Sequence, residues 1–213
     1  MIFLSQLLYL ISHHGFLFIV FLMIVSILLA VKFGKIAIPI VAFVLSIISA
    51  FTSQYLNAAF LNAYGTRTTA VITKATETNS TLNDAPIFDY DFIVKKLNGS
   101  YAQGTFSTTT AAIYPIANSI NIPQEGLEFP VKFIPGYEKN IVILYDESED
   151  GKRAKLTEAL GDLNKARIQY EASPDDHSFT QEYIDALEKF IRENKDQDMT
   201  DYESKLAELK KAL

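Results

Sequence analysis

Two long apolar runs occupy the first 61 residues of the chain. Between Ile2 and Val31 the only titratable side chains besides tyrosine are the neighbours His13 and His14, and between Ile36 and Leu61 there is only tyrosine. Each run exceeds the about 20 apolar residues that an α-helix needs to cross a hydrocarbon core. The pattern therefore predicts a transmembrane helical hairpin over residues 1–61, with spans at about 8–31 and 36–58.

A short break, Lys32-Phe33-Gly34-Lys35, separates the two runs. Glycine ends helices readily and lysine favours the membrane surface, so we expect a tight membrane turn marked by Lys32 and Lys35. A cleaved signal peptide would have a basic start, a single shorter apolar run and a cleavage site of small residues. Here the apolar run starts at once and is repeated, so we expect it to be retained.

A hairpin places both chain ends on one side of the membrane, and positive charge near the spans decides which side that is. The turn carries two lysines. The other side offers the α-amino group, Arg67 and the more distant Lys74. This balance favours a cytoplasmic turn, and it predicts that both termini and the polar region lie outside the cytoplasm.

Small residues recur at helical spacing in the second run, at Ser46, Ser49, Ala50 and Ser53. Small side chains let two helices approach closely within a membrane. The approaching helix is either the first helix of the hairpin or one from another copy of the chain, which would make the protein a homo-oligomer.

His13 and His14 are the ionisable groups nearest to membrane depth. Ionisable side chains that are buried in a membrane are usually functional. The alternative is a span that begins near Phe16, which leaves Met1 to Ser12 as an interfacial segment and both histidines at the lipid headgroups. Adjacent histidines also point in different directions on a helix, which makes them a poor two-ligand metal site.

From residue 62 the apolar pattern changes to a period of two, which is typical of half-buried strands. Asn98-Gly99 favours a type I′ hairpin turn, because that turn needs positive φ at both positions, and Pro130 indicates an edge strand or a bulge. The pattern predicts a small five-stranded antiparallel β-barrel or sandwich over residues 62–147. Its predicted strands are Thr66–Thr76, Ile87–Leu97, Ser100–Thr110, Leu127–Phe133 and Ile141–Tyr145.

Residues 148–213 form a third region with helical periodicity. Ser178-x-x-Gln181 and Thr200-x-x-Glu203 match the capping box that starts helices, and a C-terminal bundle of three short amphipathic helices is predicted. Its last helix has an apolar stripe that either packs on the rest of the protein or binds a partner. The stripe consists of Tyr202, Leu206, Leu209 and Leu213.

Charge is divided along the chain as unevenly as hydrophobicity. The net charge of the 213 residues is −6, but the first 61 residues hold only two charged side chains, and the other 152 hold 17 basic and 25 acidic ones. A polar region of net charge −8 repels a phosphate backbone, which excludes a nucleic-acid-binding protein. It favours a basic protein partner or divalent cations and disfavours an anionic membrane surface.

Three short sequence motifs follow one another in the polar region. Gly65 leads into a Thr/Val strand that reaches Thr73, a Tyr-x-Phe strand from Tyr90 to Tyr101 contains the Asn-Gly hairpin, and the third segment reads Phe129-Pro-Val-Lys-Phe-Ile-Pro-Gly-Tyr-Glu-Lys-Asn140. Over Gly65 to Tyr145 the chain resembles the bacterial membrane-protein family catalogued as domain of unknown function 3592. It departs from that family in having Tyr137-Glu138 in place of a second proline and no predicted closing transmembrane helix. The resemblance implies a β-domain held at a membrane, with no established activity.

Catalytic motifs are missing from the sequence. It has no cysteine, no Gly-x-Ser-x-Gly, no His-Glu-x-x-His and no glycine-rich phosphate loop. Asp89 and Asp91 share one strand face and could share a cation, but the same alternation places both in solvent. Asp175-Asp176-His177 resembles a ligand triplet, yet Ser-Pro-Asp-Asp is also typical of a turn. We therefore predict no catalytic residue, no metal and no cofactor.

Together these features predict a non-enzymatic protein of a bacterial inner membrane that presents a periplasmic domain for protein binding, as an accessory subunit of an envelope complex. One alternative is an immunity protein that neutralises an envelope-delivered toxin, such as a type VI secretion effector. Another is a carboxylate- or metal-dependent envelope enzyme.

Overall fold

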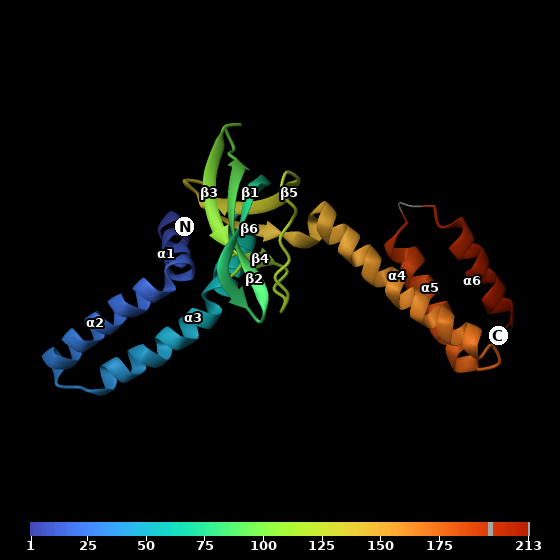
Figure 1. The fold of residues 1–213 in the computed structure, drawn as a ribbon, viewed down its shortest axis with the longest axis horizontal. Helices are drawn as coiled ribbons and strands as arrows, with labels where there is room; N and C mark the ends of the chain where they lie inside the picture. The colour runs from blue at the N-terminus through green and yellow to red at the C-terminus, as the bar shows by residue number, and fades with distance from the viewer. Residues whose placement is uncertain (196–197, 213) are drawn as a thin grey trace. The chain divides into compact units, whose positions relative to one another are not determined.

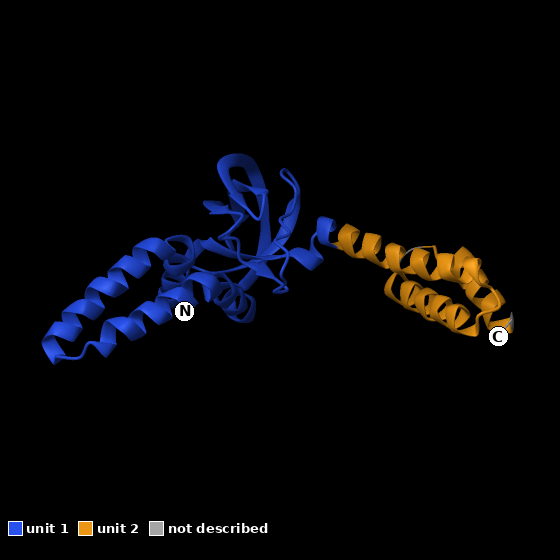
Figure 2. Ribbon diagram, turned by 60° about the horizontal axis from the view of Figure 1, so that its bottom comes forward, with its two compact units in different colours: residues 1–151 blue, residues 152–213 orange. Residues whose placement is uncertain are grey.

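The computed structural model describes residues 1–195 and 198–212. The chain forms two compact units, Met1–Gly151 and Lys152–Leu213 (Figure 2). In the described residues the fold is α+β, with six α-helices and one six-stranded mixed sheet. Three of the helices precede the sheet and three follow it (Figure 1).

The first unit begins with helices α1 (Ile2–His13), α2 (Gly15–Phe33) and α3 (Ala37–Tyr64). The backbone breaks at His14, so α1 is separate from α2, and α2 starts close to the alternative boundary at Phe16. Gly34 ends α2 in the left-handed conformation, with φ 63°, as expected for the membrane turn. Lys32 and Lys35 are both exposed at this turn.

Helices α2 and α3 are long and apolar enough to cross a membrane. They contact each other and lie side by side in both views (Figures 1 and 2). Their outward faces expose large apolar side chains, including Phe16 at 77%, Leu28 at 65% and Phe51 at 73%. A core helix of a soluble protein would bury such residues, so this surface supports membrane association.

Some of the small residues of α3 are buried within the first unit. Ala42, Ser46 and Ser53 are buried, and Ser26 of α2 is also buried. Ser46 donates its hydroxyl to the carbonyl oxygen of Ala42 at 2.8 Å, which satisfies it within its own helix. Of the four small residues predicted to let another helix approach, Ser46 and Ser53 are therefore covered within the chain, whereas Ser49 is half-buried and Ala50 is exposed.

The sheet follows directly after α3. Its strand order is β3-β2-β1-β5-β6-β4, and all neighbours are antiparallel except β4 and β6, which are parallel. The prediction of five strands, all antiparallel, lacked β4, because a two-residue strand has no periodicity of its own and exists only through its pairing with β6. The strands are β1 (Thr66–Leu82), β2 (Ala85–Lys95), β3 (Tyr101–Ser107), β4 (Ile113–Tyr114), β5 (Glu128–Ile134) and β6 (Tyr137–Leu144).

The main core lies on one face of a curled sheet. Phe92 of β2 and Phe106 of β3 belong to the same buried cluster as Ile141 and Ile143 of β6. Strands from both halves of the sheet therefore share one core, which requires strong curvature. Buried and exposed side chains alternate along β2 as predicted, since Phe92 and Val94 are buried while Asp89 and Asp91 are exposed.

Two turns differ from their sequence-based descriptions. The hairpin at Asn98-Gly99 is present, but only Gly99 has positive φ there, at 83°. The two-residue turn with positive φ at both positions is Asn83-Asp84, between β1 and β2. Pro130 is on an internal strand, not an edge, because β5 lies between β1 and β6, and the β5–β6 ladder starts one residue later at Val131.

A second cluster covers the outer face of the sheet. Ala58 and Leu61 of α3 pack there with Ile134 and Val142, and Leu8 of α1 packs against them. Strand β6 is therefore buried on both faces, as its continuous apolar sequence predicts. This packing joins the sheet directly to the helices at the membrane.

The second unit is helical. It contains α4 (Glu149–Ala172) from Lys152 onward, α5 (His177–Glu193) and α6 (Thr200–Ala212), and its buried core includes Leu163, Leu187 and Leu209. Asp176, and not Ser178, is the N-cap of α5. The Ser178 hydroxyl and amide both donate to the Asp176 carboxylate, which lowers the pKa of that carboxyl. The triplet Asp175-Asp176-His177 thus starts a helix.

Candidate functional site

A buried cluster of hydrogen-bonded side chains lies where α1, α3 and β6 of the first unit meet. Asn57 Nδ2 donates to Asn140 Oδ1 at 2.8 Å, and Asn140 Nδ2 donates back to Asn57 Oδ1 at 2.9 Å. Asn140 Nδ2 also lies 3.1 Å from the carbonyl oxygen and 3.0 Å from the hydroxyl of Ser5. None of the three residues is more than 1% exposed. We call Ser5, Asn57 and Asn140 the polar junction.

Local sequence explains why these side chains converge. Asn57 follows Ser46 and Ser53 on the buried face of α3, at the helical spacings of seven and four residues. Asn140 starts the apolar part of β6 and shares a strand face with Val142, which packs toward α3. The polar junction therefore closes the end of a small-residue face.

An aromatic group lies beside the polar junction. The rings of Tyr9 and His13 stack with centroids 3.9 Å apart, and Tyr137 meets Tyr9 edge to face at 5.6 Å. Lys139 Nζ lies 5.0 Å from the Tyr9 ring centroid and 5.1 Å from that of Tyr137. A cation within about 6 Å of a ring centroid is attracted to the ring face, so Lys139 joins β6 to α1.

Burial changes the titration of two groups in this cluster. It lowers the pKa of His13 to about 4, and the nearby charge of Lys139 acts in the same direction. It raises the pKa of Tyr9. Because of its low pKa, His13 is neutral at pH 7.

A small cavity adjoins His13 and is also lined by Thr110, Lys139 and Asn140. Its volume of about 10 Å³ is about what one water molecule requires.

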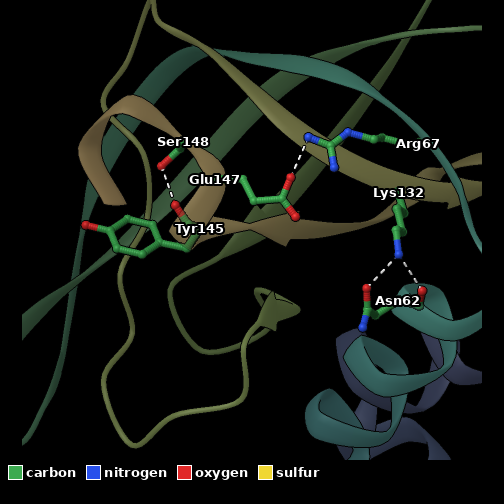
Figure 3. Close-up of polar contacts among 6 residues, drawn as sticks. All are labelled: Asn62, Arg67, Lys132, Tyr145, Glu147 and Ser148. Carbon is green, nitrogen blue, oxygen red and sulfur yellow. Dashed lines mark hydrogen bonds and ion pairs between the residues drawn. The ribbon is translucent and has the colours of Figure 1, made fainter. Parts of the chain in front are cut away.

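A second set of polar contacts ties the end of α3 to the sheet (Figure 3). Lys132 Nζ of β5 donates to the backbone carbonyl and the side-chain oxygen of Asn62, each at 2.7 Å. A cation at this position satisfies the free carbonyl groups of a helix C-terminus. Arg67 of β1 pairs with Glu147, and the Ser148 hydroxyl donates to the Tyr145 carbonyl oxygen at 2.6 Å.

These contacts favour a mechanical role for the site. Within the described residues, every buried side-chain nitrogen or oxygen has a hydrogen-bond partner. A fully satisfied buried network fixes one arrangement of the elements that supply it. Here those elements are α1, α3 and β6, so the network fixes the sheet against the two helices.

The structure places the predicted partner-binding stripe in the core of the helical unit. Leu209 is fully buried, and Tyr202 and Leu206 pack against the same core. Leu213 lies outside the described residues. These positions favour the packing alternative for Tyr202, Leu206 and Leu209.

The polar junction itself was not among the residues that we predicted as functional. Its sequence signal is that Asn57 precedes the apolar residues Ala58 to Leu61 of α3 and that Asn140 directly precedes the apolar end of β6. Such amides are costly to bury alone, which indicates a partner elsewhere in the chain. Periodicity cannot identify that partner.

Comparison with known proteins adds no relative to this description. No family model matches the chain, and neither a curated protein nor a solved structure matches it. The function is therefore argued from the geometry alone.

Proposed function

We propose that the chain is a non-enzymatic protein of a bacterial inner membrane, anchored by α2 and α3, that holds its sheet and helical unit outside the cytoplasm to bind another protein. In this proposal it is an accessory subunit of an envelope complex. The observation that carries the proposal is the buried junction of Ser5, Asn57 and Asn140, because it couples a lipid-facing helix directly to the sheet.

The anchor is supported by the exposed apolar surface of both helices. Phe16, Phe51 and Val31, at 77%, 73% and 80% exposure, are large side chains that lipid would cover. The orientation rests on the two lysines of the turn, which favour the cytoplasmic side.

A rigid mount is useful when a domain must meet a partner at a defined height and angle. The sheet is held by the polar junction, by Lys139 against Tyr9 and Tyr137, and by Lys132 at the end of α3. A flexible tether would suffice for a freely diffusing catalytic domain. These contacts therefore support presentation of a surface.

The long β1–β2 hairpin provides such a surface. The last residue of β1 that pairs with β5 is Val71, and beyond it Glu125 accepts a hydrogen bond from the Ala75 amide. Among the described residues, no strand pairs with this edge of β1 from Thr76 to Leu82. Free strand edges recruit extended peptides by backbone hydrogen bonds, so we propose this edge as the partner-binding element.

The proposal is tested in native membranes with a photo-crosslinking amino acid at Thr81, which is exposed on this edge. The expected result is one discrete protein adduct. The matched control is the same amino acid at Leu97, which is 64% exposed in the β2–β3 connection and should give none. A chain that purifies alone and gives no adduct at Thr81 would contradict the proposal.

Orientation is tested separately with a reporter that is active only outside the cytoplasm. Fused to the C-terminal end of the chain it should be active, and inserted in the turn between Lys32 and Lys35 it should be inactive. The opposite pattern would reverse the orientation. The identity of the crosslinked protein then distinguishes a subunit of a resident complex from a toxin.

A further inference from the structure

The segment between β4 and β5 combines an unusual composition with unusual exposure. The chain has no charged residue between Lys96 and Glu125. Within this interval Tyr114, Ile116 and Ile120 are 39%, 48% and 39% exposed. An exposed apolar loop that is also uncharged is atypical of a surface in contact with water. We call residues 114–120 the apolar loop.

The apolar loop lies against α3. Ile116 and Ile120 line a cleft whose opposite wall consists of Gln54, Tyr55 and Ala58. Phe51 and Leu56, on α3 at 73% and 58% exposure, continue the apolar surface around the helix. The loop thus extends the lipid-facing surface of the hairpin sideways from the helix.

The lengths of the two helices give the depth of this contact. Helix α2 has 19 residues, which at about 1.5 Å per residue span about 28 Å, close to the about 30 Å of a hydrocarbon core. The two helices start from one turn, and the first 19 residues of α3 end at Tyr55. The remaining nine residues of α3 therefore extend about 13 Å beyond the hydrocarbon. The apolar loop contacts α3 where the hydrocarbon ends.

We propose that the apolar loop is a second membrane contact, which inserts Ile116 and Ile120 into the lipid–water interface beside α3. Tyrosine is favoured at this level, since its ring is apolar and its hydroxyl reaches water; Tyr55 lines the cleft, and Tyr114 directly precedes Pro115, which also lines it. With α3 as one contact and the loop as another, the sheet cannot rotate freely about the helix axis. The bilayer thereby sets the direction in which the partner-binding edge of β1 points.

The occupant of this surface is lipid and not a protein, because the loop is continuous with the lipid-facing side of α3 at the same depth. A neutral loop also adds no repulsion from anionic headgroups, unlike the rest of the region, whose net charge is −8. The inference rests on the anchoring part of the proposed function and adds to it the orientation of the sheet.

The absence of tryptophan from the sequence permits a direct test. Ile116→Trp and Ile120→Trp each create a single tryptophan, which is excited selectively over tyrosine, in the intact chain. The variants are reconstituted in phosphatidylcholine vesicles with and without bromine on the acyl-chain carbons nearest the glycerol. We expect blue-shifted emission from both variants and a loss of emission in the brominated vesicles. Both positions are exposed, so tryptophan fits without disturbing the core.

Two matched variants make each outcome decisive. Phe51→Trp, on the lipid-facing side of α3, should be quenched whenever the hairpin is anchored. Leu97→Trp should not be quenched, because Leu97 lies near Lys95, whose carbonyl oxygen accepts from Thr68 beyond the end of α3. Loop variants that emit like Leu97→Trp, while Phe51→Trp is quenched, would overturn the inference and leave the anchor intact. An unquenched Phe51→Trp would overturn the anchor as well.

Discussion

Asn57 and Asn140 exchange two hydrogen bonds across 83 positions of the sequence, at 2.8 and 2.9 Å, with both side chains at most 1% exposed. One residue belongs to α3, which is long and apolar enough to cross a membrane, and the other to a strand of the sheet. This pair therefore connects α3 directly to the sheet. Its consequences can be tested by substitution.

Replacing Asn140 by alanine should detach α1 and weaken the mount. The change leaves the Asn57 amide and the Ser5 hydroxyl buried without this partner, a loss that costs about 2 kcal/mol. Hydrogen exchange in detergent should show faster exchange of the α1 amides. The control is Asn79→Ala, which removes an exposed asparagine of β1 and should change nothing. Equal protection of α1 in both variants would contradict the role of the pair.

Stability should fall between pH 6.5 and pH 4 because of His13. Its pKa is about 4 in the folded protein, against about 6.5 when unfolded, so the unfolded chain binds more protons in this range. The loss is complete below pH 4 and amounts to at most about 3 kcal/mol. Lys139, Tyr9 and His14 surround the ring and supply no acidic partner that would offset it.

This pH dependence is measured as the thermal unfolding temperature at pH 7 and pH 5. His13→Gln keeps a polar side chain without the titration, so its unfolding temperature should fall less over the same interval. If the unfolding temperatures of wild type and variant fall equally from pH 7 to pH 5, His13 is not the group that causes the loss of stability.

Gly151 should not tolerate a side chain, whereas Gly161 should. An added Cβ at Gly151 would lie 2.0 Å from the Tyr145 carbonyl oxygen, which is backbone and cannot move aside alone. Gly151→Ala should therefore destabilise the start of α4, where the Gly151 amide donates to the Ser148 hydroxyl at 3.0 Å. The same helix has open space at Gly161, and Gly161→Ala should stabilise it by about 0.5–1 kcal/mol. Thermal unfolding should show opposite shifts, and shifts of one sign would refute the packing argument.

The stability of the helical unit should depend on the buried side chain of Leu209. Leu209 is fully buried, so Leu209→Ala should cost about 2–5 kcal/mol and expose the α5 amides to hydrogen exchange. Ile168→Ala removes an apolar side chain that is 59% exposed in the same unit and should have little effect. If Leu209→Ala left α5 protected but abolished a protein interaction, the stripe would be a binding face after all.

Much of the local structure could be predicted from the residues. The break at Lys32 to Lys35, the alternation of β2 and the helical stripes each depend on neighbours within a few positions, and the structure contains the corresponding turn, strand and helices. Strand β4 could not be predicted, since two residues have no period. Pro130 indicated an edge strand or a bulge, whereas β5 is an internal strand whose irregularity lies at Phe133 and Ile134. In each of these failures a distant pairing decided the local geometry.

The polar junction could not be predicted from sequence periodicity. Two buried asparagines can be recognised as unusual in apolar runs, but nothing in a period of 3.6 or two tells which strand face meets which helix. The apolar loop is similar, because its lack of charge is visible in the sequence and its contact with α3 is not.

By itself, then, the sequence determined the division into an apolar hairpin and an acidic polar region, because transfer of side chains between water and hydrocarbon is set by composition over about 20 residues. Only the tertiary structure decided that α1 is separate from α2, that Asn57 meets Asn140, and that residues 115–120 lie against α3 at Gln54, Tyr55 and Ala58. These relationships depend on packing between elements far apart in the chain, and packing is selected by shape and by the need to satisfy every buried polar group.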